Sequence, residues 1–130
     1  MTSRLLTEDR GSAIAEFSLV SVLLTALVLG VVQLALALHV RNTTLDAAAE
    51  GARYAALADT GLDAGIERTK DLIATAVGPA YTTDVSAAYV EFAGVPAVGV
   101  RVVTSIPLVG LLGVERGLDV SGHAALESMD

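Results

Sequence analysis

The sequence predicts an α+β protein in which a long N-terminal transmembrane helix extends into a small domain with a second helix and a three-stranded antiparallel sheet. The 22 residues from Phe17 to Leu38 carry no formal charge, and Gln33 is the one strongly polar side chain among them. About 20 apolar residues in a helix cross the hydrocarbon core of a bilayer, so we expect a transmembrane segment at about 17–40. An alanine-rich stretch follows, and the hydrophobic period then changes from helical to alternating.

Composition limits the classes of function. The chain has 130 residues, enough for one domain, and a formal net charge of −7. It shows no basic patch interleaved with aromatic residues, so we expect no binding to nucleic acid. Cysteine is absent, which excludes disulfides, thiolate metal sites and a cysteine nucleophile.

The transmembrane segment is predicted to continue as one helix over residues 12–58. Residues 42–57 are rich in alanine and contain no proline, and Asp59-Thr60-Gly61 is a stop signal. Small residues permit close approach of another helix, although alanine is also simply a good helix former. The small and apolar residues that fall on one face are Leu45, Ala48, Ala49, Ala52 and Ala56.

Residues 59–130 are predicted to form the α+β domain. A second helix runs from Asp63 to Val77 with Ile66, Ile73 and Val77 on its apolar stripe, and Gly78-Pro79 ends it. Three alternating segments then predict an antiparallel meander with one face buried against a helix. Pro107 closes the second strand, and an apolar loop spans Leu108 to Gly117. The alternating positions are Ala88, Val90 and Phe92, then Val98, Val100, Val102, Thr104 and Ile106, and finally Leu118, Val120, Gly122, Ala124 and Leu126.

The sequence contains few of the residue patterns that catalytic sites require. His39 lies at the predicted membrane boundary and His123 in the last strand, where a lone histidine is most often an interfacial or surface residue. No metalloprotease, nucleophile-elbow or phosphate-loop motif occurs. We therefore expect no enzymatic activity, no metal and no cofactor.

The segment before the apolar run has an unusual acidic residue. Residues 1–11 form a short polar leader, and Glu16 lies one residue before the run. A carboxylate at the edge of a membrane helix is costly unless it finds a partner, although it could also mark the water-facing end of the helix. A cut after Gly11 would give Ser12 a free amine and make Glu16 the fifth residue of the product.

This pattern resembles the type IV prepilin signal. With Phe17 directly after the glutamate, it resembles more narrowly the TadE family of tight-adherence, or Flp-type, pilus systems. Residues 49–56 resemble the family's pattern just past the membrane segment, whereas Val22 stands where the family often has proline. The resemblance implies a minor pilin or pseudopilin cut by a prepilin peptidase that reads Gly11, Ser12, Glu16 and Phe17.

The resemblance also implies partners and a location. The partners are the prepilin peptidase, the lipid bilayer, and other pilins with the tight-adherence assembly machinery. The protein would lie in the cytoplasmic membrane with its N-terminus inside and its C-terminal domain outside, before incorporation into a surface pilus. Glu16 would pair with the Ser12 amine of a neighbouring subunit, or with that of its own chain. The residues implied in helix packing and assembly are Glu16, Gly30, Gly51, Ala52 and Arg53.

Two other interpretations stay open at this point. A membrane-anchored extracytoplasmic binding domain would remain uncut at Gly11 and begin at Met1 or Thr2. A secreted soluble domain would arise by cleavage within the signal-peptide-like pattern Ala35-Leu36-Ala37 and begin at Leu38. The N-terminal residue of the mature protein distinguishes these interpretations from the pilin, which would begin at Ser12.

Overall fold

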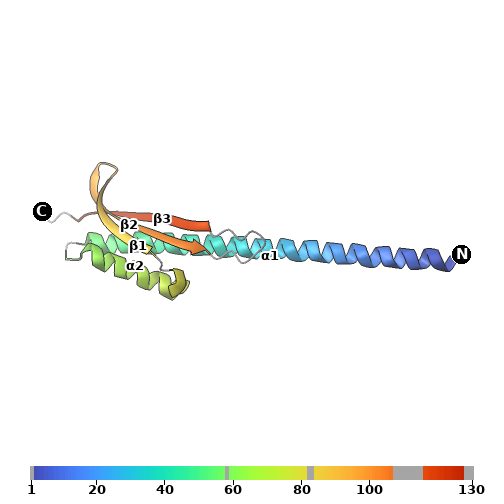
Figure 1. Ribbon diagram of the computed structural model, residues 1–130. Helices are drawn as coiled ribbons and strands as arrows, with labels where there is room; N and C mark the ends of the chain where they lie inside the picture. Colours follow the sequence, from blue (N-terminus) through green and yellow to red (C-terminus); the bar gives the residue numbers. More distant parts are fainter. Residues whose placement is uncertain (1, 58, 82–83, 107–115, 128–130) are drawn as a thin grey trace. The chain divides into compact units, whose positions relative to one another are not determined.

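The computed structural model describes residues 2–57, 59–81, 84–106 and 116–127. They form two compact units, Met1–Ala35 and Leu36–Asp130, which we describe separately. The elements are α1 (Thr2–Ala56), α2 (Leu62–Ala76), a 3-10 turn η1 (Pro79–Tyr81), and the strands β1 (Asp84–Phe92), β2 (Val95–Ile106) and β3 (Arg116–Ala125) (Figure 1). The predicted long helix, second helix and three-stranded antiparallel sheet are confirmed.

Helix α1 begins further toward the N-terminus than the predicted Ser12. It includes Gly11, which costs about 1 kcal/mol relative to alanine inside a helix, and the leader contains no proline to break it. The helix ends at Ala56 rather than Ala58, where the Thr60 hydroxyl donates hydrogen bonds to the carbonyl oxygens of Tyr54 and Leu57, the latter at 3.1 Å. These bonds satisfy carbonyl groups that the last turn leaves without helical partners.

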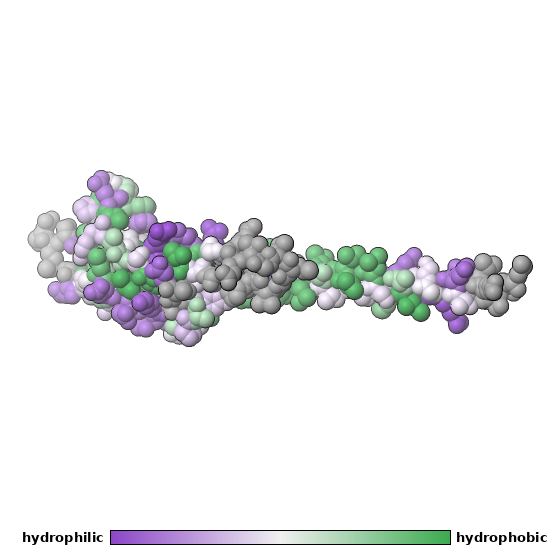
Figure 2. Space-filling model, in the orientation of Figure 1, coloured by the Kyte–Doolittle hydropathy of each residue, from purple (hydrophilic) through white to green (hydrophobic). Residues whose placement is uncertain are grey.

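The first unit is a stretch of helix α1 whose side chains are largely exposed. Phe17 is 75% exposed and Val22 66% exposed, and the large apolar residues between them are similarly bare. Figure 2 shows hydrophobic residues along the visible face of this stretch. Residues Thr7–Ala56 include a window of mean hydropathy 2.5 with none of it buried, so this is a helix long and apolar enough to cross a membrane.

The second unit has its core between the sheet and the last turns of α1. Strand order is β1-β2-β3, and both pairs are antiparallel. Val98, Val100 and Val102 are fully buried and Thr104 is 2% exposed, which confirms the predicted inward face of β2. The apolar loop predicted between β2 and β3 falls largely on residues 107–115, outside the described part of the chain, and Gly117 belongs to β3.

The predicted face of the first strand was wrong. Strand β1 begins at Asp84, and its buried side chain is Val85, with Ala87 partly buried beside it. These residues pair with Val102 and Val100, and directly paired residues point to the same face of a sheet. The opposite face of the sheet therefore carries Ala88, Val90 and Phe92. Both sets of alternate residues in β1 contain apolar side chains, so the sequence pattern alone does not show which set is buried. The register with β2 decides it.

That outer face carries an aromatic stack. The rings of Phe92 and His123 are 4.7 Å apart at their centroids and nearly parallel, at 9°. In the register, Phe92 is opposite Val95 and His123 is opposite Gly99, so the two rings flank Ala97. Ala97 is only 1% exposed although it lies on this outer face, and the stack explains its burial.

Glycine and threonine bring α1 and α2 together. The buried residues of α2 are Gly65, Thr69 and Ile73. A Cβ atom on Gly65 would lie 2.5 Å from the Cβ of Ala55, so only glycine permits this approach. The predicted stripe of Ile66, Ile73 and Val77 packs on the core, with Ile73 fully buried and the other two partly buried, but the prediction missed the buried Gly65 and Thr69.

Candidate functional site

The predicted processing segment lies on one continuous stretch of α1. Gly11, Ser12, Glu16 and Phe17 are all exposed and helical. A Cβ atom on Gly11 would meet nothing within 4 Å among the described residues, so the peptide bond after Gly11 lies on an open stretch of helix. An enzyme that cuts after Gly11 would have to unwind the helix locally, and glycine lowers the cost of doing so.

Ser12 and Glu16 are four residues apart, which places them on the same face of the helix. Once Ser12 is the first residue, its amine and the carboxylate of Glu16 would lie within one turn, at the helix end that favours negative charge. A neighbouring chain's amine could meet the same exposed carboxylate. Among the described side chains, the ion pairs are Glu50 with Arg53 and Arg101 with Asp119, so Glu16 belongs to neither.

The predicted packing residues fall into two groups in the structure. Gly30 lies on the bare helix, where a Cβ atom would meet nothing within 4 Å. Gly51 and Ala52 are buried in the second unit, where a Cβ atom on Gly51 would lie 2.8 Å from the Gly65 carbonyl oxygen and overlap the Thr69 side chain. Gly51 and Ala52 therefore make packing contacts within the chain.

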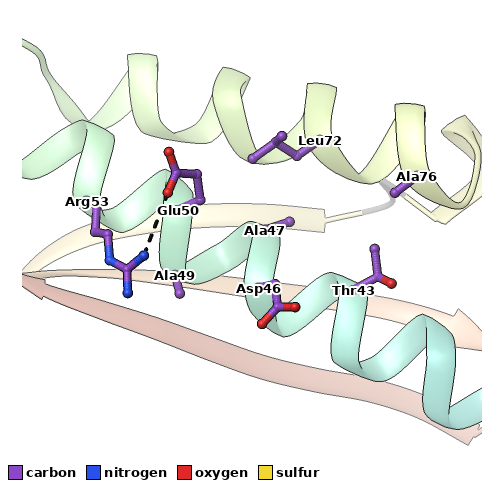
Figure 3. A pocket seen from close by; sticks show the side chains of 8 residues that line it. All are labelled: Thr43, Asp46, Ala47, Ala49, Glu50, Arg53, Leu72 and Ala76. Atoms are coloured by element: carbon purple, nitrogen blue, oxygen red, sulfur yellow. Dashed lines mark ion pairs between the residues drawn. The ribbon is translucent and has the colours of Figure 1, made fainter.

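Arg53 is on the outside of the same helix. Its guanidinium is 3.8 Å from the Glu50 carboxylate, and its side chain is 73% exposed. The pair lines an open groove of about 400 Å³ between α1 and α2 (Figure 3). Sequence reasoning missed this groove, although polar residues at helical spacing on α1 were a signal for its rim. The lining residues are Thr43, Asp46, Ala47, Ala49, Glu50, Arg53, Leu72 and Ala76.

The groove offers little catalytic chemistry. Its polar groups are two carboxylates, one guanidinium and one hydroxyl around an alanine and leucine floor. In the described ranges, no three or more histidine, aspartate or glutamate side chains gather where they could hold a metal ion. The groove therefore presents a charged helix face beside an apolar floor.

An ion pair of the second unit lies on the outer face of the sheet. The Arg101 Nε donates a hydrogen bond to Asp119 Oδ1 at 2.8 Å, and its Nη2 bonds to Oδ2. This hydrogen bond lowers the pKa of Asp119 and raises the pKa of Arg101. Both side chains are exposed, so solvent screens the pair and it does not form a buried site.

These features define a class of protein: an α+β domain joined to an N-terminal helix that can cross a membrane, as a membrane anchor would. A family model described as TadE-like protein matches residues 11–53, which confirms the predicted resemblance: this segment is similar to TadE-like proteins. The match begins at Gly11 and ends at Arg53, so it contains every predicted site residue and stops before α2. No curated protein and no solved structure matches the chain.

Proposed function

We propose that this protein is a minor pilin or pseudopilin that takes part in assembly of a tight-adherence, Flp-type pilus. The observation that carries the proposal is the position of the family match. It starts at Gly11, the proposed cleavage residue, and continues through Glu16 and the bare apolar helix. TadE-like proteins are associated with Tad pili, and a minor component is the role that the long C-terminal domain favours.

The proposed mechanism begins with processing in the cytoplasmic membrane. A prepilin peptidase cuts after Gly11 on the cytoplasmic side, and the α+β domain of residues 59–130 lies outside. The mature chain then enters a bundle of helices in which the Ser12 amine and the Glu16 carboxylate lose contact with water. A buried charge costs several kcal/mol without a partner, so pairing of these groups between neighbouring subunits would fix their axial register.

The role is structural rather than enzymatic. The TadE-like family is typically structural, and the groove beside α1 holds no arrangement of nucleophile, base and oxyanion donors. The exposed side chains of residues 7–35 are those of a helix that packs against lipid or other helices. The C-terminal domain keeps its own core and can therefore sit at the surface of an assembly.

The N-terminus of the mature protein tests this function. Mass spectrometry of the protein from cells with and without the prepilin peptidase should find Ser12 as the first residue only when the peptidase is present. A chain that begins at Met1 or Thr2 in both strains would instead support an uncut, membrane-anchored binding domain. A chain that begins at Leu38 would support a secreted domain.

A further inference from the structure

The hairpin formed by β1 and β2 extends beyond the part of the sheet that the helices cover. Val98 of β2 is fully buried, whereas Tyr89, its direct partner on β1, is 61% exposed. The next pair on the same face, Glu91 and Pro96, is exposed as well. On these two strands the cover of the helices therefore ends near Val98, and the hairpin curves away from the helices in Figure 1.

The end of the hairpin is held in place by its turn and by the chain after β3. Ala93 and Gly94 have positive φ angles of 53° and 80°, as the two-residue turn that matches the twist of paired strands requires. The backbone N–H of Leu126 donates a hydrogen bond to the carbonyl oxygen of Pro96 at 3.1 Å. These contacts fix the backbone around the turn before any partner binds, which lowers the entropy lost on binding.

An open pocket of about 290 Å³ lies beside this turn. It is lined by one phenol ring and one carboxylate, those of Tyr89 and Glu91, together with apolar side chains, and none of its lining residues is basic. Among the described side chains, Glu91 belongs to neither ion pair. The pocket therefore combines an exposed aromatic ring with a carboxylate that has no ion-pair partner. The lining residues are Tyr89, Val90, Glu91, Pro96 and Leu126.

This combination of groups fits a cationic side chain. A guanidinium or ammonium group is attracted both to the face of a tyrosine ring and to a carboxylate, and it can meet both in one pocket. An anion would be repelled by Glu91. An uncharged apolar group would remove water from the carboxylate without replacing its hydrogen bonds, which costs free energy.

The side chains around the pocket indicate that the cation belongs to a protein. Among the described residues of the three strands, the exposed large hydrophobic side chains are those of Tyr89, Phe92 and Val95, at 61%, 54% and 48%. All three belong to this hairpin, and Phe92 pairs directly with Val95. A free cation would leave these side chains in water, whereas a polypeptide can cover them while its basic residue enters the pocket.

We propose that the end of the β1–β2 hairpin is a docking site for another protein. The partner places an arginine or lysine side chain against the Tyr89 ring and the Glu91 carboxylate, and its adjacent apolar side chains cover Phe92 and Val95. Glu91 selects a positively charged side chain, and the aromatic residues supply the apolar contact. This docking site goes beyond the pilus role and depends on neither cleavage at Gly11 nor membrane insertion.

Two blocked tripeptides test this site: leucyl-arginyl-leucine amide, and its citrulline analogue, which keeps the shape of arginine without the positive charge. The full-length, isotope-labelled protein in micelles of an uncharged detergent is titrated with each peptide, and its amide chemical shifts are followed by NMR. We expect the arginine peptide to shift the amides of Tyr89, Glu91 and Leu126. The citrulline peptide should bind about threefold more weakly, because it lacks the attraction to the ring and the carboxylate.

Variants separate this pocket from a general attraction to an acidic protein. Glu91→Gln and Tyr89→Leu should each weaken binding of the arginine peptide about threefold, because one removes the charge and the other removes the ring. Asp84→Asn removes the same charge at the other end of β1 and should leave the affinity unchanged. Absence of shifts at this hairpin, equal affinity for the two peptides, or equal affinity of Glu91→Gln and Asp84→Asn would each overturn the proposal. These outcomes leave the pilus role intact, since the mature N-terminus tests that role separately.

Discussion

Gly51 of α1 lies against the side chain of Thr69 of α2, with no space between them for a methyl group. The Thr69 hydroxyl donates a hydrogen bond to the Gly65 carbonyl oxygen at 2.8 Å and lies 3.5 Å from the carbonyl oxygen of Ala47 on α1. The Thr69 hydroxyl thus lies between the two helices, where larger apolar side chains would otherwise make the contact. The two helices thus meet through their backbones.

Gly51→Ala should therefore destabilise the domain despite the better helix propensity of alanine. Overpacking typically costs about 1–3 kcal/mol and alanine recovers about 1 kcal/mol in a helix, so we expect a net loss of up to about 2 kcal/mol. Thermal and urea unfolding of the full chain in detergent would measure it. Gly30→Ala is the matched control, since it meets no neighbour; equal stability of the two variants would contradict the close contact.

Val102 tests the inward face of β2. It is fully buried between Val85 and Val120 in neighbouring strands, and Val102→Asp would bury an unpaired carboxylate. We expect a loss on the order of 3 kcal/mol or more, enough to unfold the domain in far-UV circular dichroism. Ser86→Asp adds the same charge at an exposed position of β1 and should leave the spectrum unchanged.

The Arg101–Asp119 pair should give stability a pH dependence. Because the folded-state pKa of Asp119 is lowered by its hydrogen bond from Arg101, the contribution is fully present above the unfolded pKa of about 3.9 and is lost as pH falls through the folded value. The difference in unfolding free energy between wild type and Asp119→Asn should thus be constant above about pH 5 and shrink below the ordinary aspartate pKa. A difference that grows on acidification would show that the pair does not stabilise the fold.

Gly11→Leu should block processing without disturbing the fold. A Cβ atom on Gly11 would meet nothing within 4 Å among the described residues, so a leucine there leaves their packing undisturbed and acts on the peptidase. We expect uncut precursor to accumulate in the membrane, seen by mass spectrometry of cells that contain the peptidase. Gly30→Leu places the same side chain at another open glycine of α1 and should mature normally. Normal maturation of Gly11→Leu would exclude a cut at this position.

Glu16 separates assembly from membrane attachment. Glu16→Ala should still be inserted and cut, because the peptidase reads mainly the Gly11 side of the cleaved bond. It should then fail to enter pili, because the Ser12 amine of the neighbouring subunit would be buried without a counter-charge. Glu16→Gln keeps the size and hydrogen bonding of the side chain but not its charge, and should fail nearly as badly. The measurement is the ratio of this protein in sheared pili to that in membranes. An unchanged ratio in both variants would remove the assembly role.

The sequence by itself predicted those parts of the protein whose signal is local. The uncharged run from Phe17 to Leu38 predicted a helix able to cross a membrane, and the alternation from Val98 to Thr104 predicted the buried face of β2. The pattern from Gly11 to Phe17 predicted the TadE-like resemblance. Hydrophobicity and a motif with fixed spacing can each be read without knowing what packs against them.

Only the tertiary structure decided how the elements meet. It turned Val85 and Ala87 of β1 inward instead of Val90 and Phe92, because pairing with β2 sets the register. It also buried Gly51 against Thr69, two residues that carry no hydrophobic signal. A small residue becomes a packing residue only when another backbone arrives beside it, and that approach depends on the whole fold rather than on its own segment.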